Sequence, residues 1–154
     1  MRVYVTGGSG FLGRQIVLMA RALGHEVLAP RSSEADLFSL RSLNEWFAAQ
    51  EAEGRPIEAV VHSAAYYGGL NITMSEPADI LFKNLTMINT LFQAAAKAKV
   101  KKIVSVGSAC AYPGDLNGDM PESAFWSGPL HESVLGYGFT KKVQHVAQQV
   151  VHKQ

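Results

Sequence analysis

The 154-residue sequence has a single cysteine, almost no net charge and no long apolar run. One cysteine excludes an internal disulfide and is typical of a reducing compartment. A formal net charge of +1 gives no field that would attract nucleic acid or an anionic membrane surface. No apolar run approaches the roughly 18 residues that a membrane span needs, and the chain enters a β-prone run too early for a leader peptide. We therefore expect a cytoplasmic protein that binds neither nucleic acid nor membrane.

What the sequence has is an ordinary globular composition with one glycine-rich stretch near its start. Val3, Tyr4 and Val5 form a β-prone run, and Gly7, Gly10 and Gly13 then follow at three-residue steps as a helical pattern begins. A strand, a tight turn and a helix N-terminus make an anion site, because unpaired amide groups and the helix dipole face the same point. The spacing departs from the usual G-x-G-x-x-G, so this stretch alone leaves an ordinary glycine-rich turn as the alternative.

The rest of the chain alternates between strand and helix patterns. Periodicity predicts a helix ending at Gly24, a helix capped by Ser39, a helix over Pro77–Lys97 and a last helix opened by Tyr137. That last helix carries Val143, Val146, Ala147 and Val150 on one face. Predicted strands are 26–29, Ala35–Leu37, Ala59–His62 and Ile103–Val106, and 107–136 is a long irregular segment.

Strands that alternate with helices indicate an α/β fold with a doubly wound parallel sheet. The length fits one dinucleotide-binding domain over residues 1–154. Because the chain stops with its last helix barely finished, we expect it to be the first part of a longer two-domain protein. The 154 residues would then lack the last strands of the sheet and a C-terminal substrate domain.

Three side chains downstream suggest chemistry. Ser108 follows the strand 103–106, where ligands of open α/β sheets bind, and Tyr137 and Lys141 lie one helical turn apart. A lysine ammonium near a phenol is expected to lower the phenol's pKa, so that the tyrosine can exchange a proton with a carbinol oxygen during hydride transfer. By itself such a pair is more often a surface pair, and the glycine turn makes the catalytic interpretation the favoured one.

The end of the second predicted strand bears on the choice of cofactor. Arg31 lies about twenty residues after the glycine turn, where an acidic residue would bind the ribose 2′-hydroxyl of NAD. A guanidinium can instead pair with a 2′-phosphate, which favours NADP. Glu34 lies close enough in the sequence to keep NAD as the alternative.

The string Thr6-Gly7-Gly8-Ser9-Gly10-Phe11-Leu12-Gly13, with Ser108 and Tyr137-Gly-Phe-Thr-Lys141, resembles the extended short-chain dehydrogenases/reductases. A finer pattern is similar to the GDP-L-fucose synthase family: it comprises 64–70, Lys83-Asn84, Gly107-Ser108-Ala109-Cys110-Ala111-Tyr112-Pro113 and Pro121-Glu122-Ser123. The resemblance implies a Rossmann fold and an NADP-dependent enzyme. That enzyme epimerises a GDP-4-keto-6-deoxy sugar and then reduces its C4 ketone.

The resemblance also assigns roles position by position. Ser108, Tyr137 and Lys141 match the reductive triad, with Tyr137 as general acid, and Cys110 matches the cysteine that transfers protons during epimerisation. Asn84 matches an asparagine near the nicotinamide, and Asp36 an aspartate at the adenine amino group. The implied cofactor contacts are Gly7, Gly10, Phe11, Leu12, Gly13, Arg31, Asp36, Leu37, Ala64, Ala65, Tyr137 and Lys141. No metal is implied.

Two other functions stay open at this point. An NAD-dependent nucleotide-sugar 4-epimerase or 4,6-dehydratase shares the triad, although Cys110 and Arg31 argue against it. A non-catalytic NADP-binding module is the other, and it describes best how the 154 residues alone should behave, because the sugar pocket needs residues beyond them. The resemblance also suggests a homodimer formed by two long helices of each chain packed as a four-helix bundle.

Overall fold

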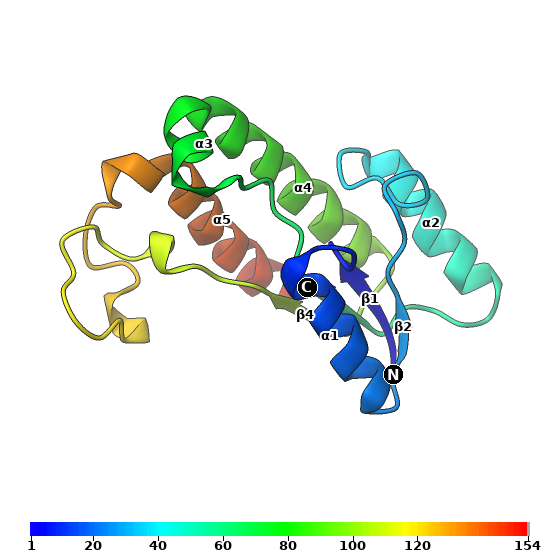
Figure 1. Ribbon diagram of the computed structural model, residues 1–154. Helices are drawn as coiled ribbons and strands as arrows, with labels where there is room; N and C mark the ends of the chain where they lie inside the picture. Colours follow the sequence, from blue (N-terminus) through cyan, green and yellow to red (C-terminus); the bar gives the residue numbers. More distant parts are fainter. Residues whose placement is uncertain (154) are drawn as a thin grey trace. The chain divides into compact units, whose positions relative to one another are not determined.

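The computed structural model describes residues 1–153 as a parallel sheet with helices (Figure 1). The described residues contain four strands: β1 (Arg2–Thr6), β2 (Glu26–Leu28), β3 (Ala59–His62) and β4 (Lys102–Ser105). Their order is β2-β1-β3-β4 and every pairing is parallel, with Val3 opposite both Val27 and Ala59. The predicted doubly wound α/β fold is confirmed.

Five α-helices and three short 3-10 helices connect and follow the strands in this described part. The α-helices are α1 (Phe11–Ala22), α2 (Leu40–Ala52), α3 (Gly69–Ser75), α4 (Pro77–Lys97) and α5 (Leu135–His152). The 3-10 helices are η1 (Ala109–Ala111), η2 (Glu122–Ala124) and η3 (Glu132–Val134), and all three lie in the segment predicted as irregular. The sequence patterns thus place α1, α2 and α4 closely, and they miss the short helix α3.

Contacts divide the chain into two compact units. The first, here called the sheet unit, is Met1–Ala65 with Thr86–Val106, and the second, here called the helical unit, is Tyr66–Leu85 with the residues from Gly107 onward. The sheet unit therefore holds all four described strands with α1 and α2, and the helical unit holds α3, α5 and the 3-10 helices.

The core of the sheet unit has two layers, because successive side chains of β1 point to opposite faces. Val3 and Val5 pack with Val17 of α1, whereas Tyr4 packs with Phe47 of α2 and Leu91 of α4. Ser39 caps α2 as predicted, since its side chain accepts a hydrogen bond from the Ser42 amide. Every residue of β1 is buried, as expected for a strand covered on both faces.

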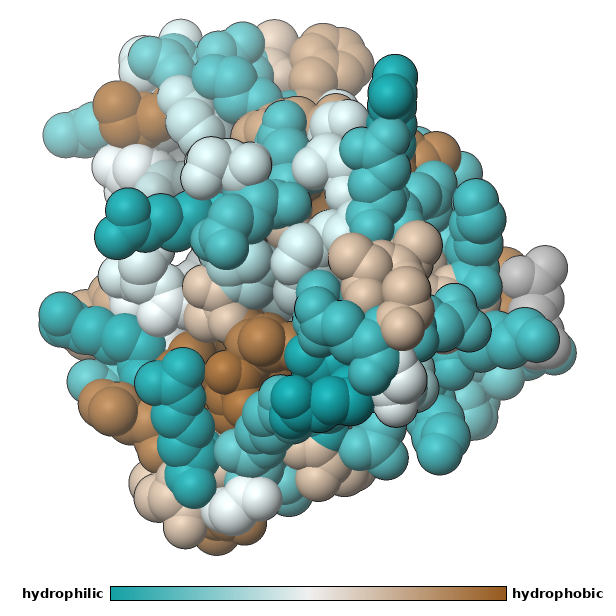
Figure 2. All heavy atoms as spheres, turned by 90° about the vertical axis from the view of Figure 1, so that its right-hand side faces the viewer, coloured by the Kyte–Doolittle hydropathy of each residue, from teal (hydrophilic) through white to brown (hydrophobic). Residues whose placement is uncertain are grey.

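The outer surface near α2 is mainly hydrophilic. Figure 2 shows the face on the right-hand side of Figure 1, where teal hydrophilic side chains predominate among pale ones and smaller brown hydrophobic groups. Arg41 and Glu45, one turn apart on α2, are exposed and form an ion pair at 2.7 Å. The polar face of α2 therefore meets solvent, as its amphipathic pattern predicts.

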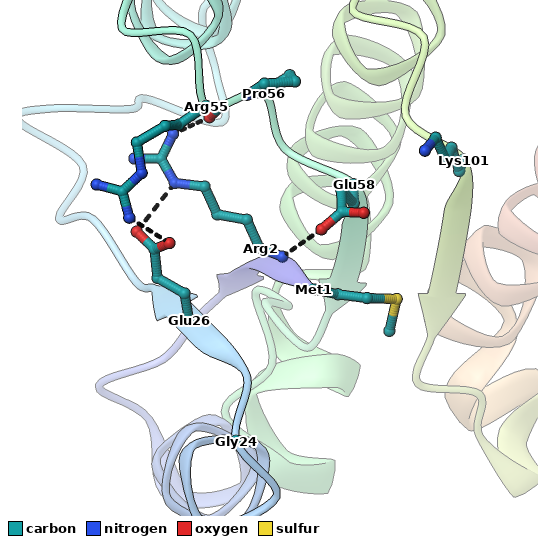
Figure 3. A pocket seen from close by; sticks show the side chains of 8 residues that line it. All are labelled: Met1, Arg2, Gly24, Glu26, Arg55, Pro56, Glu58 and Lys101. Carbon is teal, nitrogen blue, oxygen red and sulfur yellow. Dashed lines mark hydrogen bonds and ion pairs between the residues drawn. The ribbon is translucent and has the colours of Figure 1, made fainter.

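Charged side chains gather where β1 and β2 begin, around a cavity of about 440 Å³. Figure 3 shows the Arg2 side chain between Glu26 and Arg55, where its Nε lies 3.1 Å from a Glu26 carboxylate oxygen and its Nη1 donates to the Arg55 carbonyl. Glu26 also pairs with Arg55, and Glu58 accepts from the Arg2 amide at 2.8 Å. The side chains of Arg2 and Arg55 are therefore both paired with the Glu26 carboxylate.

One predicted element is wrong. Ala35–Leu37 forms no strand, because this short segment turns directly into the cap of α2; the Glu34 and Ala35 amides donate to the Arg31 carbonyl. On α5, 42% of Val146 and 54% of Val150 are accessible, whereas Thr140, Lys141, Lys142 and Gln144 are buried. Within residues 1–153 no helix is long and apolar enough to cross a membrane.

Candidate functional site

The glycine turn joins the end of β1 to the start of α1. Gly7 has a φ of +65°, a conformation that side chains rarely adopt, and a Cβ on Gly7 would lie 2.9 Å from the Ala64 Cα. A Cβ on Gly13 would lie 2.0 Å from the Gly7 carbonyl oxygen, so the first turn of α1 sits directly on the loop. No side chain caps α1 at Gly10, which leaves the first amides of the helix to face outward. This cradle fits the pyrophosphate of a dinucleotide.

Thr6, at the end of β1, ties this turn to the end of β3. Its Oγ1 accepts from the Ser63 and Ala64 amides, both at 3.1 Å, and lies 2.8 Å from His62 Nδ1. Because both lone pairs of the hydroxyl accept amide protons, its own proton is donated to His62 Nδ1. Thr6 and His62 are each 2% exposed, whereas Ser63 and Ala64 are half-buried. The contact places Ala64 beside Gly7.

A cavity of about 420 Å³ opens beside the turn within the sheet unit. It is lined by Gly7, Gly8, Ser9, Arg31, Asp36, Leu37, Phe38 and Ala64, among others. The Asp36 carboxylate accepts from the Phe38 amide at 2.9 Å, and the Arg31 amide donates to Glu34 at 2.9 Å. Since Glu34 engages only the backbone of Arg31, the exposed guanidinium is directed neither to Glu34 nor, within residues 1–153, to any other described acid.

The second group of predicted residues lies in the helical unit. Ser108 caps η1, and its Oγ accepts from the Cys110 amide at 3.2 Å. Gly138 of α5 lets η1 approach, because a Cβ there would lie 2.1 Å from the Cys110 carbonyl oxygen. Tyr137 precedes Gly138 in the first turn of α5, so η1, which holds Cys110 and is capped by Ser108, packs against the turn that carries Tyr137.

The electrostatics of Tyr137 differ from the expectation. The pKa of Tyr137 is raised, first by burial and then by the charges that Cys110 and Tyr67 would carry. Lys141 lies with its Nζ 5.5 Å from the centre of the Tyr137 ring and donates to Gln144 Oε1 at 3.3 Å. Burial lowers the pKa of Lys141 to about 8, which weakens the cation that was expected to stabilise a phenolate.

Asn84 is buried and positions the loop before α3. Its Oδ1 accepts from the Tyr66 amide at 2.9 Å, while its Nδ2 donates to the Tyr66 carbonyl at 2.8 Å and to the Ile80 carbonyl at 2.7 Å. Both amide protons are therefore used by the backbone. The structure gives Asn84 a positioning contact, and its place near a nicotinamide stays a prediction.

The predicted residues thus form two groups. Gly7, Gly10, Phe11, Leu12, Gly13, Arg31, Asp36, Leu37, Ala64 and Ala65 belong to the sheet unit. Asn84, Ser108, Cys110, Tyr137 and Lys141 belong to the helical unit. Sequence reasoning missed Thr6 and Tyr67 as site residues, although both stand inside quoted motifs. Among residues 1–153 no three acidic, histidine or cysteine side chains cluster as metal ligands.

Known proteins resemble this chain over most of its length. The model of the NAD dependent epimerase/dehydratase family matches residues 3–154. The GDP-L-fucose synthase of Azorhizobium caulinodans is 27% identical over 142 residues, which are 92% of this chain and 44% of that protein. The putative GDP-L-fucose synthase 2 of Arabidopsis thaliana is 31% identical over 141 residues, which are 91% of this chain and 42% of that protein.

Solved structures show the same fold. A crystal structure of a GDP-D-glycero-L-gluco-heptose synthase from Campylobacter jejuni in the presence of NADPH superposes with a TM-score of 0.88 at 22% identity. The superposition covers 99% of this chain and 44% of that one. The chain accordingly spans less than half the length of the curated relatives that it matches.

Proposed function

Because the chain belongs to the NAD dependent epimerase/dehydratase family, we propose that it is the NADP-binding part of a GDP-sugar epimerase/reductase. Two observations carry the proposal: the sheet unit has a glycine cradle that a Cβ at Gly13 would fill, and in the helical unit η1, with Ser108 and Cys110, packs against the first turn of α5. The relatives named as GDP-L-fucose synthases support a GDP-linked keto sugar as substrate.

In this proposal the chain's own residues bind the cofactor, orient the substrate carbonyl and protonate its oxygen. The turn from Gly7 to Gly13 holds the pyrophosphate, and bound NADPH supplies the hydride for the sugar's C4 carbon. The Ser108 hydroxyl orients the carbonyl oxygen and Tyr137 donates its proton to that oxygen as the hydride arrives. Cys110, which lies beside Tyr137, moves the proton at the epimerised carbon. A raised pKa suits Tyr137 as a donor, since the phenol stays protonated at neutral pH.

The reaction has a direct test in the protein in the longest form that its gene encodes. With GDP-4-keto-6-deoxymannose we expect one NADPH oxidised per sugar reduced, followed by absorbance and product chromatography. Tyr137→Phe should lower the turnover number by roughly 10²–10⁴-fold, because the proton donor is lost. As a control, Tyr112→Phe removes a phenolic oxygen at the end of η1 and should leave turnover near wild type.

Turnover that survives Tyr137→Phe would contradict the mechanism. NADPH that is never consumed, with NAD retained through purification, would favour the 4-epimerase or 4,6-dehydratase alternative. The 154-residue chain alone should bind the cofactor with little or no turnover, which is also how a non-catalytic module would behave.

Arg31 should decide the choice between the two cofactors. We expect the chain to bind NADPH more tightly than NADH. Arg31→Ala should lower the affinity for NADPH by roughly 10–100-fold, because a charge-assisted pair with the 2′-phosphate is lost. NADH binding should stay the same. Isothermal titration measures both, with Arg41→Ala as the matched control on an exposed arginine of α2. Equal dissociation constants for NADPH and NADH, unchanged in Arg31→Ala, would refute this role.

Exposed apolar side chains support the proposed homodimer. Phe82 of α4 and Phe139, Val146 and Val150 of α5 are 42–64% exposed. Paired helices from two chains would cover them as a four-helix bundle.

A further inference from the structure

Tyr67 lies against the phenol that the proposed mechanism uses. The ring centres of Tyr67 and Tyr137 are 4.5 Å apart and the planes are tilted by 35°. Tyr67 comes from the loop between β3 and α3, and 45% of its surface remains exposed. An aromatic pair at this distance is attractive beyond the area it buries, so each ring restricts the other.

The backbone that presents Tyr67 is fixed from α4. Asn84 holds both the amide and the carbonyl of Tyr66, the preceding residue, and is only 4% exposed. The Lys83 ammonium lies 4.0 Å from the centre of the Tyr66 ring, and the Tyr66 hydroxyl donates to Glu76 at 3.2 Å. Tyr67 is therefore held next to Tyr137 by its neighbour's contacts rather than by its own exposed side chain.

We propose that Tyr67 is a positioning residue for Tyr137: its ring packs against the phenol and orients it. The proposal rests on the proposed function only in taking Tyr137 as the proton donor. Two phenols in contact do not ionise independently, because the first negative charge opposes the second. The negative charge of an ionised Tyr67 therefore opposes ionisation of Tyr137, in addition to the larger effect of burial on the pKa of Tyr137.

The other groups that face Tyr137 allow this effect to be separated. Cys110 of η1 acts in the same direction as Tyr67, since its thiolate would also raise the pKa of Tyr137. Lys141 of α5 lies over the same ring, and its own lowered pKa limits its charge above about pH 8. A change confined to Tyr67 leaves both of these groups in place.

The experiment is a pH titration by NMR of the chain labelled with ¹³C at the tyrosine Cζ. Tyr137→Phe assigns the Tyr137 signal. In Tyr67→Phe we expect the ring-current shift of that signal to persist and its titration midpoint to fall, because the ring stays and the second phenol is gone. In Tyr67→Leu we expect both the ring-current shift to disappear and the midpoint to fall.

Tyr66→Phe is the matched control, since it removes a neighbouring phenol that contacts Glu76 instead. It should leave the Tyr137 signal unchanged. If neither Tyr67 variant changed the chemical shift or the titration midpoint of the Tyr137 signal, the proposal would be overturned. Because Tyr67 is almost half exposed, neither variant needs to disturb the core, and signal dispersion confirms folding.

A second measurement, on the longest encoded form, separates this proposal from the proposed function. Tyr67→Leu should lower the turnover number roughly tenfold or more, and Tyr67→Phe should restore it while moving the alkaline limb of the pH profile to lower pH. Unchanged turnover and pH profile in Tyr67→Leu would overturn the positioning role. Absence of ketone reduction in the wild type would overturn the proposed function instead. The NMR titration would still test the contact between Tyr67 and Tyr137, because it does not depend on turnover.

Discussion

Replacing Gly13 by alanine should abolish dinucleotide binding by the chain and destabilise it. The new Cβ would lie 2.0 Å from the Gly7 carbonyl oxygen and 2.6 Å from its carbon, and both are backbone atoms that cannot rotate away. Alanine in place of glycine favours a helix by only about 1 kcal/mol. Overpacking against backbone costs about 1–3 kcal/mol or more, so the clash outweighs the propensity. Thermal unfolding and titration with NADPH measure the two effects.

Gly107→Ala is the control for this prediction. A Cβ at Gly107 meets no atom within 4 Å, so the same methyl group is added in open space. The control should keep wild-type stability and NADPH affinity. If Gly13→Ala bound NADPH as the wild type does, the cradle between the turn and α1 would not be the pyrophosphate site.

The fold could be predicted from the sequence wherever the residues of a single helix or strand show its pattern. The run from Val3 to Val5 is buried on both faces, and the periodicity of 77–97 matches α4. Ser39 could be identified as a cap because its partner lies three residues away. Such local patterns need no knowledge of the rest of the molecule.

What escaped prediction depends on contacts between distant segments. The sequence does not show that α5 buries the polar side chains of Thr140, Lys141 and Gln144, because that burial depends on the segments that contact α5, which include η1 and η3, and not on the pattern of α5 itself. Thr6 looks like an ordinary strand residue until its oxygen is found at the amides of Ser63 and Ala64. The role proposed for Tyr67 likewise depends on its contact with the ring of Tyr137, which the sequence does not show.

The phenol–amine pair shows the limit of spacing as evidence. A spacing of four positions places Tyr137 and Lys141 on one helical face, and this geometry is found. Spacing cannot give burial, however, and burial lowers the pKa of the lysine while it raises that of the tyrosine. The sign of the effect on Tyr137 is therefore decided by its surroundings rather than by the motif.

Gly138→Ala should damage the helical unit and spare the dinucleotide cavity. Its Cβ would lie 2.1 Å from the Cys110 carbonyl oxygen and 3.0 Å from the Cys110 carbonyl carbon, so η1 must move away from α5. Helix propensity again favours alanine by about 1 kcal/mol, which is too little to offset a backbone clash. Cys110, the only cysteine of the chain, then reports the movement through faster alkylation by iodoacetamide.

The two glycines should thus separate the two units of the chain. All residues that line the cavity at Arg31 belong to the sheet unit, so Gly138→Ala should retain NADPH binding while Gly13→Ala loses it. Conversely, the alkylation rate of Cys110 should rise in Gly138→Ala and stay at its wild-type value in folded Gly13→Ala. In the longest encoded form, Gly138→Ala should also lower turnover, because Ser108 and Cys110 no longer lie beside Tyr137. Wild-type alkylation and turnover in Gly138→Ala would show that the close approach of η1 to α5 is not needed for the site.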